Sequence, residues 1–148
     1  MTCDFNIGVP ATPQEFEQYY ELRWRILRAP WDQPRGSEKD EYEKTAVHVC
    51  IKSDTGMVVG LGRLHTISAG IAQIRYMAID ENYRNQGMGK RIYLYLEYKA
   101  KQSGIKTIIV DARENAVGFY QSMGFRITGI GHTLFNQIKH KVMEKELL

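Results

Sequence analysis

The chain has 148 residues, of which 43% are hydrophobic and 25% charged, and its formal net charge at pH 7 is +3. These values are typical of a soluble globular protein, and the length suits one domain, residues 1–148, with its own hydrophobic core. The mild charge is unlike the clustered basic surface of nucleic-acid-binding proteins. Cys3 and Cys50 are too few for a disulfide framework and lack zinc-site spacing, so we expect no metal.

No apolar run approaches the length of a membrane span, and the first ten residues, MTCDFNIGVP, lack the basic and apolar regions of a signal peptide. We therefore expect a cytoplasmic protein without a membrane partner.

The first predicted element is a helix that begins at Pro13. Thr12 and Glu15 form a capping-box pattern around this proline, which is favourable at the first helical position. Pro30 ends the helix. A stripe of apolar residues at helical spacing predicts its buried face, made of Phe16, Tyr20, Trp24 and Leu27. The polar segment WDQPRGSEKDEYEK follows and is predicted as a loop with a short helical piece.

Three strands are predicted next, over residues 46–51, 57–67 and 72–80, with turn signals between them. Alternation in the first strand places Val47, Val49 and Ile51 on one face. His48 and Cys50 lie on the opposite face.

A second helix follows a glycine-containing loop, and Gly104 is its predicted end. Its expected buried stripe consists of Met88, Ile92, Leu96 and Ala100. An apolar strand over 106–112 comes next, then a brief helix in NAVGFYQSMG, capped by Asn115, and an antiparallel pair over 125–135 and 138–147. The strand–helix–strand succession predicts parallel neighbours joined by a crossover. The expected fold class is α/β: one mixed, mostly antiparallel sheet with a central parallel pair, flanked by helices.

The loop before the second helix carries Gly87 and Gly89, and three phosphate-loop patterns compete for it. The Walker pattern fails because Arg84 and Arg91 stand at its first glycine and its Ser/Thr positions. The dinucleotide pattern GxGxxG fails at Ile92. The third pattern, [RQ]xxGx[GA], is met in full. Backbone N–H groups, the helix dipole and nearby cations would suit an anionic pyrophosphate here, and a simple glycine turn is the alternative.

This third pattern, placed between a strand and a helix and followed by NAVGFYQSMGF, resembles the Gcn5-related N-acetyltransferase (GNAT) superfamily, most specifically from Gln73 to Phe125. The resemblance implies the GNAT acyl-CoA N-acyltransferase fold. It also implies direct transfer of an acetyl group from acetyl-CoA, as co-substrate, to a primary amine on a small molecule or a protein. The pyrophosphate would be held by Arg84, Asn85, Gln86, Gly87, Met88, Gly89 and Lys90.

By the same resemblance, the strand QIRYMAID would carry a bulge and splay away from residues 107–110. Backbone amides near Met77, Ala78 and Ile79 would then bind the cofactor and polarise the acetyl carbonyl. Tyr120 would donate a proton to the departing sulfur, and a purely packed aromatic is the alternative. Asn115 would contact the cofactor, or serve only as a helix cap.

The general base is harder to assign, because GNAT members often use a glutamate on the strand that carries the cofactor. Here that strand has no carboxylate before Asp80. The other candidates are His48, His65, Glu43, Asp111 and His132. We keep His48 and His132 as the candidate catalytic bases.

The segment RAPWDQPRGSEKDEYEK, residues 28–44, would wall the acceptor site by the same resemblance, and a solvated loop is the alternative. Its candidate contacts are Trp31, Arg35, Glu38, Asp40 and Glu41. Three rival interpretations remain: a non-catalytic acyl-CoA-binding module, covalent catalysis by Cys50, and nucleic-acid binding through KHKVMEK and the cluster Arg23, Arg25 and Arg28. Pairing of the terminal segment IKHKVMEKEL with a second copy would give a homodimer.

Overall fold

The computed structural model describes residues 5–148, so Cys3 lies outside the described part of the chain. Its strands form a seven-stranded sheet in the order β1-β2-β3-β4-β5-β7-β6. The strands are β1 (Asn6–Gly8), β2 (Val47–Lys52), β3 (Val58–Ser68), β4 (Ile71–Ile79), β5 (Thr107–Arg113), β6 (Arg126–Leu134) and β7 (Ile138–Glu146). Neighbours pair antiparallel except β4 and β5, which are parallel. The predicted fold class, a mixed sheet with a central parallel pair, is confirmed.

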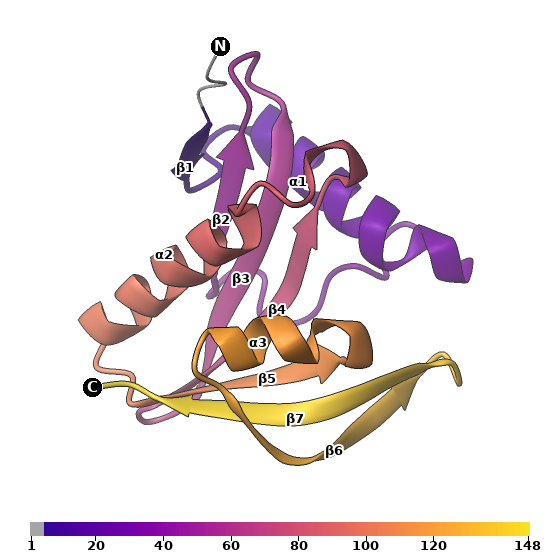
Figure 1. Cartoon of the computed structure of the whole chain (residues 1–148). Coiled ribbons are helices and arrows are strands. Elements are labelled where there is room, and N and C mark those ends of the chain that lie inside the picture. Colours follow the sequence, from indigo (N-terminus) through magenta and orange to yellow (C-terminus); the bar gives the residue numbers. More distant parts are fainter. Residues whose placement is uncertain (1–4) are drawn as a thin grey trace.

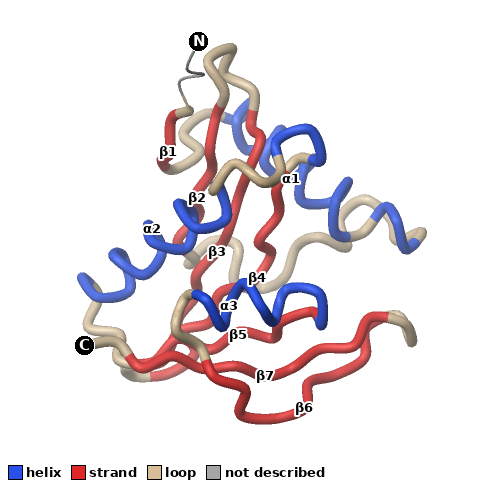
Figure 2. The backbone as a smooth tube through the Cα atoms, viewed as in Figure 1, coloured by secondary structure: helices blue, strands red, loops and turns tan. Residues whose placement is uncertain are grey.

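Helices cover both faces of the sheet (Figure 1). The α-helices are α1 (Pro13–Leu27), α2 (Met88–Gln102) and α3 (Val117–Ser122), and short 3-10 turns span Ala29–Trp31, Glu81–Tyr83 and Glu114–Ala116. One hydrophobic cluster joins α2 and α3 to the sheet, and a second, smaller cluster joins α1 to the opposite face. The tube in Figure 2 shows α1 behind the sheet and α2 in front of it. No helix within residues 5–148 has the length and apolar character needed to cross a membrane.

The start of α1 is as predicted, but its buried face is not. The Glu15 N–H donates to Thr12 Oγ1 at 3.1 Å, and Pro13 is the first helical residue. The four residues expected to form the buried stripe are each only partly buried: Phe16, Tyr20, Trp24 and Leu27. The residues that lie fully against the sheet are instead Tyr19, Leu22 and Arg23. Hydrophobic spacing could not reveal this face because one of its members is an arginine.

The buried stripe of α2 is confirmed, with Met88, Ile92, Leu96 and Ala100 all in the core. The helix approaches β3 very closely, because β3 has a glycine where the two elements meet. A Cβ on Gly62 would lie 2.7 Å from Ile92 Cγ2. This close approach fixes the height of α2 over the sheet and therefore the position of its N-terminus.

Two further predictions concern shorter elements. Alternation in β2 is confirmed, because Val49 and Ile51 lie in the α2 cluster and Cys50 in the α1 cluster. The predicted cap at Asn115 is wrong: residues 114–116 form a 3-10 turn, and α3 starts from Ala116 without a side-chain cap. Asn115 is exposed in that turn.

Candidate functional site

The parallel strands β4 and β5 pair over only four residue pairs, from Ile71 with Thr107 to Ile74 with Val110. Beyond Ile74, β4 continues along β3, whereas β5 continues along β7 as far as Arg113. The two strands therefore splay apart toward their carboxyl ends, as Figure 1 shows. The splay expected by resemblance is present, and it leaves one side of each strand without a neighbouring ladder.

A bulge in β4 lies at the start of this splay. The pairing register with β3 shifts between Leu61–Ala78 and Arg63–Arg75, and Tyr76 adopts a left-handed φ of 63°. The shift exchanges the two faces of the strand. Before the bulge, Ala72 and Ile74 face α2, and after it, residues 77 and 79 do so. Tyr76 consequently points to the α1 face.

The backbone after the bulge has its polar groups aimed in alternating directions. The Asp80 N–H donates to Val59 O at 2.8 Å, so the N–H of Ala78, two residues earlier, also faces β3. The N–H of Ile79 therefore points away from β3, into the gap between β4 and β5. By alternation, the N–H of Met77 points in the same direction. Of the three residues predicted to offer amides, Met77 and Ile79 have the suitable direction.

The glycine loop leads directly into the N-terminus of α2. Asn85 and Gly87 have left-handed φ angles of 62° and 76°, and no atom lies within 4 Å of the position that a Gly87 Cβ would take. Gly87 is the N-cap of α2 and provides no side-chain cap, so the first N–H groups of the helix, through Lys90, are open to an external acceptor. Such groups, together with the helix dipole, bind phosphate oxygens.

The other loop residues surround this N-terminus. Arg84, Gln86 and Lys90 are exposed, whereas Met88 is buried in the core and anchors the helix start. Gly89 has a packing role, because a Cβ there would lie 3.3 Å from the ring of Phe119. The loop and α3 are therefore in contact, which brings the candidate phosphate-binding site beside the segment that carries Tyr120.

Tyr120 lies in α3 on the α2 face of the sheet. Its ring packs edge-on against Phe119 and Phe125, with centroids 5.1 and 5.4 Å away. Burial raises the pKa of Tyr120 above its usual value. The phenol therefore keeps its proton at neutral pH, which a proton donor requires.

A buried network of charged residues on the α1 face was missed by sequence reasoning. Arg63 makes a bidentate ion pair with Asp40, at 2.6 and 2.9 Å, and also reaches Glu43 at 2.7 Å. Arg23 pairs with Glu43 at 2.9 Å, and Arg75 with Asp40 at 2.9 Å. The sequence offered a signal only at Arg63, which lies within the largely apolar strand VVGLGRLHTIS, whereas Arg23 lies outside the predicted apolar stripe of α1.

This network fixes the loop between α1 and β2 against the sheet. Arg23 and Arg63 are 0% exposed, and burial opposes ionisation of Asp40, yet the hydrogen bond from Arg63 holds the pKa of that carboxyl well below its usual range. The ring of Tyr76 lies among the guanidinium groups, 4.3 Å from Arg23 Cζ and 4.8 Å from Arg63 Cζ. Asp40, expected as an acceptor contact, is thus engaged with arginines.

His48 lies within the same region. Its Nδ1 is 2.8 Å from Tyr19 Oη and its Nε2 is 2.7 Å from Glu43 O. Because the carbonyl can only accept, Nε2 carries the hydrogen, and Nδ1 accepts from the tyrosine. Burial lowers the pKa of His48. Both nitrogens are occupied in this arrangement, and the role of His48 as a base stays a prediction.

His132 lies elsewhere, on β6, and half of its side chain is exposed. Its ring stacks on His140, with centroids 4.4 Å apart, and its Nδ1 is 4.0 Å from Asp111 Oδ2. Asp111 and Arg113 follow the point at which β5 leaves β4. The structure therefore brings His132 close to the carboxyl end of β5, on the face opposite Tyr120. The contacts of His132 and His48 are separate, and no hydrogen bond or ring contact joins these two histidines.

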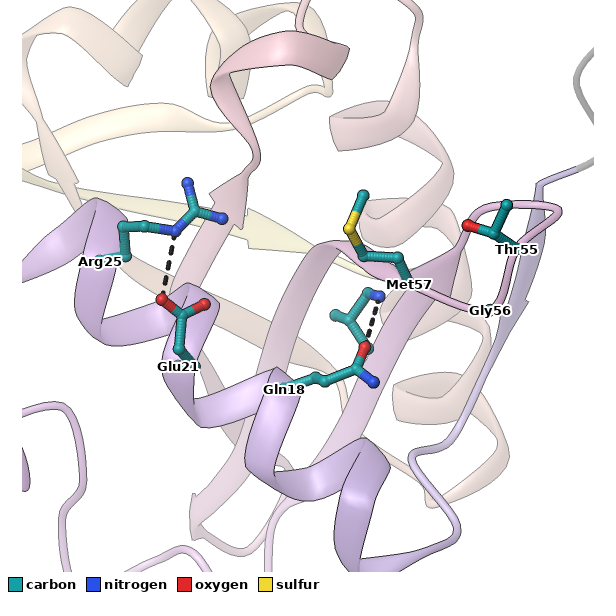
Figure 3. Close-up of a pocket in the computed structure, with 7 residues that line it drawn as sticks. Gln18, Glu21, Arg25, Thr55, Gly56 and Met57 are labelled. Atoms are coloured by element: carbon teal, nitrogen blue, oxygen red, sulfur yellow. Dashed lines mark hydrogen bonds and ion pairs between the residues drawn. The ribbon is translucent and has the colours of Figure 1, made fainter.

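A surface pocket of about 380 Å³ lies between α1 and the turn that joins β2 to β3 (Figure 3). It is lined by Gln18, Glu21, Arg25, Thr55, Gly56, Met57 and Val58. None of these residues belongs to the candidate site. Gln18 accepts the Val58 N–H at 3.0 Å, and Arg25 pairs with Glu21 at 3.3 Å, so its polar groups are already engaged within the protein.

No group of three or more His, Cys, Asp or Glu side chains within residues 5–148 has an arrangement that could hold a metal ion.

Comparisons with known proteins agree with this geometry. The family model described as the acetyltransferase (GNAT) family matches residues 16–125. The uncharacterized N-acetyltransferase YitI of Bacillus subtilis is 27% identical over 137 residues, which cover 88% of this chain and 91% of YitI. An acyl-CoA N-acyltransferase from Pseudomonas aeruginosa superposes with a TM-score of 0.81 at 18% identity, covering 97% of this chain and 99% of the other. An aminoglycoside 6'-N-acetyltransferase complexed with coenzyme A gives 0.79 at 16% identity, covering 98% and 97%.

Proposed function

Because the chain belongs to the acetyltransferase (GNAT) family, we propose that it transfers the acetyl group of acetyl-CoA directly to a primary amine. Family membership supports catalysis over the alternative of a non-catalytic acyl-CoA-binding module. The observation that carries the proposal is the open, uncapped N-terminus of α2 beside the splay between β4 and β5. The acetyl donor, the direct transfer and the residue roles below belong to the proposal.

The residues present fit a bound coenzyme A thioester. The pyrophosphate would accept hydrogen bonds from the backbone of residues 84–90, where the left-handed Gly87 leaves open space. The pantetheine amide groups would bond to the splayed side of β4, as an added strand does. No metal is required for neutralisation, because Arg84 and Lys90 are exposed beside the helix N-terminus. The thioester supplies an activated acetyl group and a leaving thiolate.

The roles of individual groups follow from their positions. The Ile79 N–H, directed into the splay, would donate to the carbonyl oxygen on which negative charge develops. Tyr120 would donate its proton to the departing sulfur. The neutral amine nitrogen bonds to the acetyl carbon as the carbon–sulfur bond breaks, and a base removes one proton from the nitrogen. That proton returns through solvent to Tyr120, so the products are the amide and the free thiol of coenzyme A. Asn115, exposed next to α3, would contact the coenzyme.

The base and the acceptor are on the α1 face in this proposal. His132 is accessible there, beside Asp111, whereas His48 is held by two hydrogen bonds. Tyr120 lies on the opposite face, so the amine and the thioester would meet in the splay. The segment 28–44, held by the Arg63–Asp40 pair, would form a wall of the acceptor site.

We further propose that the enzyme acts in the cytoplasm without nucleic acid or membrane as partner. Arg23 and Arg28 are buried, so the arginine cluster noted in the sequence does not form a surface patch. Dimerisation by pairing of the terminal strand is not feasible, because β7 already has β5 on one side and β6 on the other. A homodimer would instead use β6, which forms one edge of the sheet.

Thermal unfolding of the pure protein with acetyl-CoA, CoA, ATP and NAD, each measured separately, tests the proposal. A ligand at 100 times its dissociation constant adds about 2.7 kcal/mol of stability. We expect stabilisation by the two CoA compounds alone, followed by turnover with members of an amine panel. Stabilisation by ATP or NAD without any by CoA would refute the proposed donor.

A further inference from the structure

Two arginines, Arg28 and Arg113, meet at one carbonyl oxygen on the α1 face. Arg28 follows the last residue of α1, and Arg113 is the last residue of β5. Arg28 Nη1 and Arg113 Nη2 each donate to Leu27 O at 3.3 Å. Two positively charged groups therefore lie side by side at the end of the splayed strand.

Neither guanidinium has a carboxylate partner within residues 5–148, unlike the other buried arginines. Arg23 and Arg63, both 0% exposed, are paired with Glu43 and Asp40 respectively. Arg28 is only 6% exposed, yet its other hydrogen bond goes to a main-chain carbonyl, Ser37 O, at 3.0 Å. Burying cations without a compensating anion is unfavourable, and here the two also repel each other. Burial, together with the charge of Arg28, lowers the pKa of Arg113.

Several donors of this pair remain available. Among residues 5–148, the fully buried side-chain nitrogens without a hydrogen bond belong to Arg23 and Arg63, and none belongs to Arg28 or Arg113. The N–H groups of the pair that make no bond to the protein are therefore reachable from outside. A guanidinium fork binds the two oxygens of a carboxylate or phosphate in parallel.

Aromatic rings border the pair. The ring of Phe135, at the tip of the β6–β7 hairpin, is 5.4 Å from Arg28 Cζ, and the ring of Tyr76 is 5.6 Å from it. Tyr76 is the bulge residue of β4, so the pair is adjacent to the splay and on the face opposite Tyr120. An anionic group bound here would therefore belong to the amine acceptor rather than to the coenzyme.

We propose that the amine acceptor carries an anionic group, a carboxylate or a phosphate monoester, that Arg28 and Arg113 bind. This inference rests on the proposed function, because it concerns the second substrate of the same site. The anion would neutralise the charge pair and orient the amine toward the thioester.

The test compares acceptors that differ only in the anion. Acetyl transfer is measured with amino acids against their carboxamides, and with phosphoethanolamine against ethanolamine. We expect turnover of the anionic member of at least one pair at a kcat/KM at least tenfold above that of its neutral partner. The comparison in which the anionic acceptor is preferred identifies the anion as carboxylate or phosphate.

Two variants locate the effect, Arg28→Gln and Arg113→Gln. Each should raise KM for the anionic acceptor about tenfold or more, the loss typical of a charge-assisted hydrogen bond, with little change for the neutral partner. Stabilisation by acetyl-CoA should be unchanged. The control is Arg126→Gln, since Arg126 is exposed on β6 and pairs with the exposed Glu146. If Arg28→Gln fails to fold, Arg113→Gln still gives the answer, because within residues 5–148 the Arg113 side chain makes one hydrogen bond, to Leu27 O.

Equal turnover of charged and neutral acceptors would overturn the inference. So would an equal loss on both acceptors in the variants. Loss of acetyl-CoA stabilisation in both variants would assign the pair to the coenzyme and would likewise overturn it. Failure of the proposed function looks different: the unmodified protein would then show neither stabilisation by acetyl-CoA nor turnover of any amine.

Discussion

Arg63 in β3 and Asp40 in the loop after α1 form a two-point ion pair at 2.6 and 2.9 Å, with Arg63 completely buried. The pair crosses the α1 face and ties an irregular segment to the centre of the sheet. The stability of that segment therefore depends on charge rather than on apolar packing.

Asp40→Asn should destabilise the protein by about 3–5 kcal/mol, because it leaves buried guanidinium groups without a full partner. Against the effect of burial, the hydrogen bond from Arg63 holds the folded-state pKa of Asp40 well below the usual value of 3.8. The pair therefore contributes stability above that pH and loses it as the pH falls further. Urea unfolding across acidic pH should show a steeper loss in the unmodified protein than in the variant. The control is Glu146→Gln, which removes an exposed ion pair with Arg126 and should change the free energy of unfolding little. Equal effects of the two variants would contradict this account.

Gly87→Glu should abolish stabilisation by acetyl-CoA, because it places a carboxylate where the pyrophosphate would bind. Gly56 offers a matched control: it too has a left-handed φ, 84° against 76°, and open space around a Cβ. Gly56→Glu should therefore cost a similar backbone strain, about 1–2 kcal/mol, without affecting the ligand. Ligand-induced shifts in unfolding temperature provide the measurement. A normal acetyl-CoA shift in Gly87→Glu would remove the loop from the coenzyme site.

Tyr120→Phe should lower kcat about 10²–10⁴-fold while acetyl-CoA still stabilises the protein, because only the proton donor is lost. Tyr98→Phe is the control, since Tyr98 lies on the exposed side of α2. Steady-state kinetics at saturating amine provide the measurement. Unchanged kcat would leave Tyr120 as a packing residue.

Cys50→Ala should retain turnover. The thiol is completely buried in β2, and burial raises the pKa of Cys50 to about 11, so almost no thiolate exists at neutral pH. Activity is measured relative to stability, because the smaller side chain leaves a small cavity. An inactive variant that still bound acetyl-CoA would favour covalent catalysis.

His132→Gln should lower kcat about 10²-fold, because the proposed general base is lost. His48→Gln should instead lower the unfolding temperature, because His48 makes two hydrogen bonds across the α1 face. Steady-state kinetics and thermal unfolding of both variants distinguish these outcomes. If kcat fell about 10²-fold in His48→Gln and was unchanged in His132→Gln, the two roles would be exchanged.

Periodic patterns predicted most of the fold from the sequence. The strands, the α2 stripe and the parallel crossover each depend on local alternation or spacing, and all were found. Strand β1, Asn6–Gly8, was not predicted because three residues carry no period. The buried face of α1 was misjudged because Arg23 is solvated in isolation and becomes buried only through Glu43, far along the chain.

The candidate site divides in the same way. The glycine loop could be proposed from the sequence because its pattern, the strand before it, the helix after it and the segment NAVGFYQSMGF all lie within one stretch of the chain. The bulge at Tyr76 depends on the register between two strands, and the Arg28–Arg113 pair unites the end of a helix with the end of a strand. No motif of neighbouring residues marks the bulge or the arginine pair, so only the folded chain reveals these two features.

The short pairing between β4 and β5 has a mechanical consequence. Strands β1 to β4 form one half of the sheet and β5, β7 and β6 the other. Within residues 5–148, main-chain bonds join β4 and the turn before it to β5 over the short stretch from Gly70 to Ile74. We expect that any rotation of the halves relative to each other would occur about this seam and would open or narrow the wedge between them. A molecule bonded to both sides of the wedge would restrict that rotation. Release of product would then proceed at a rate set by the stiffness of the seam as well as by the chemistry beside it.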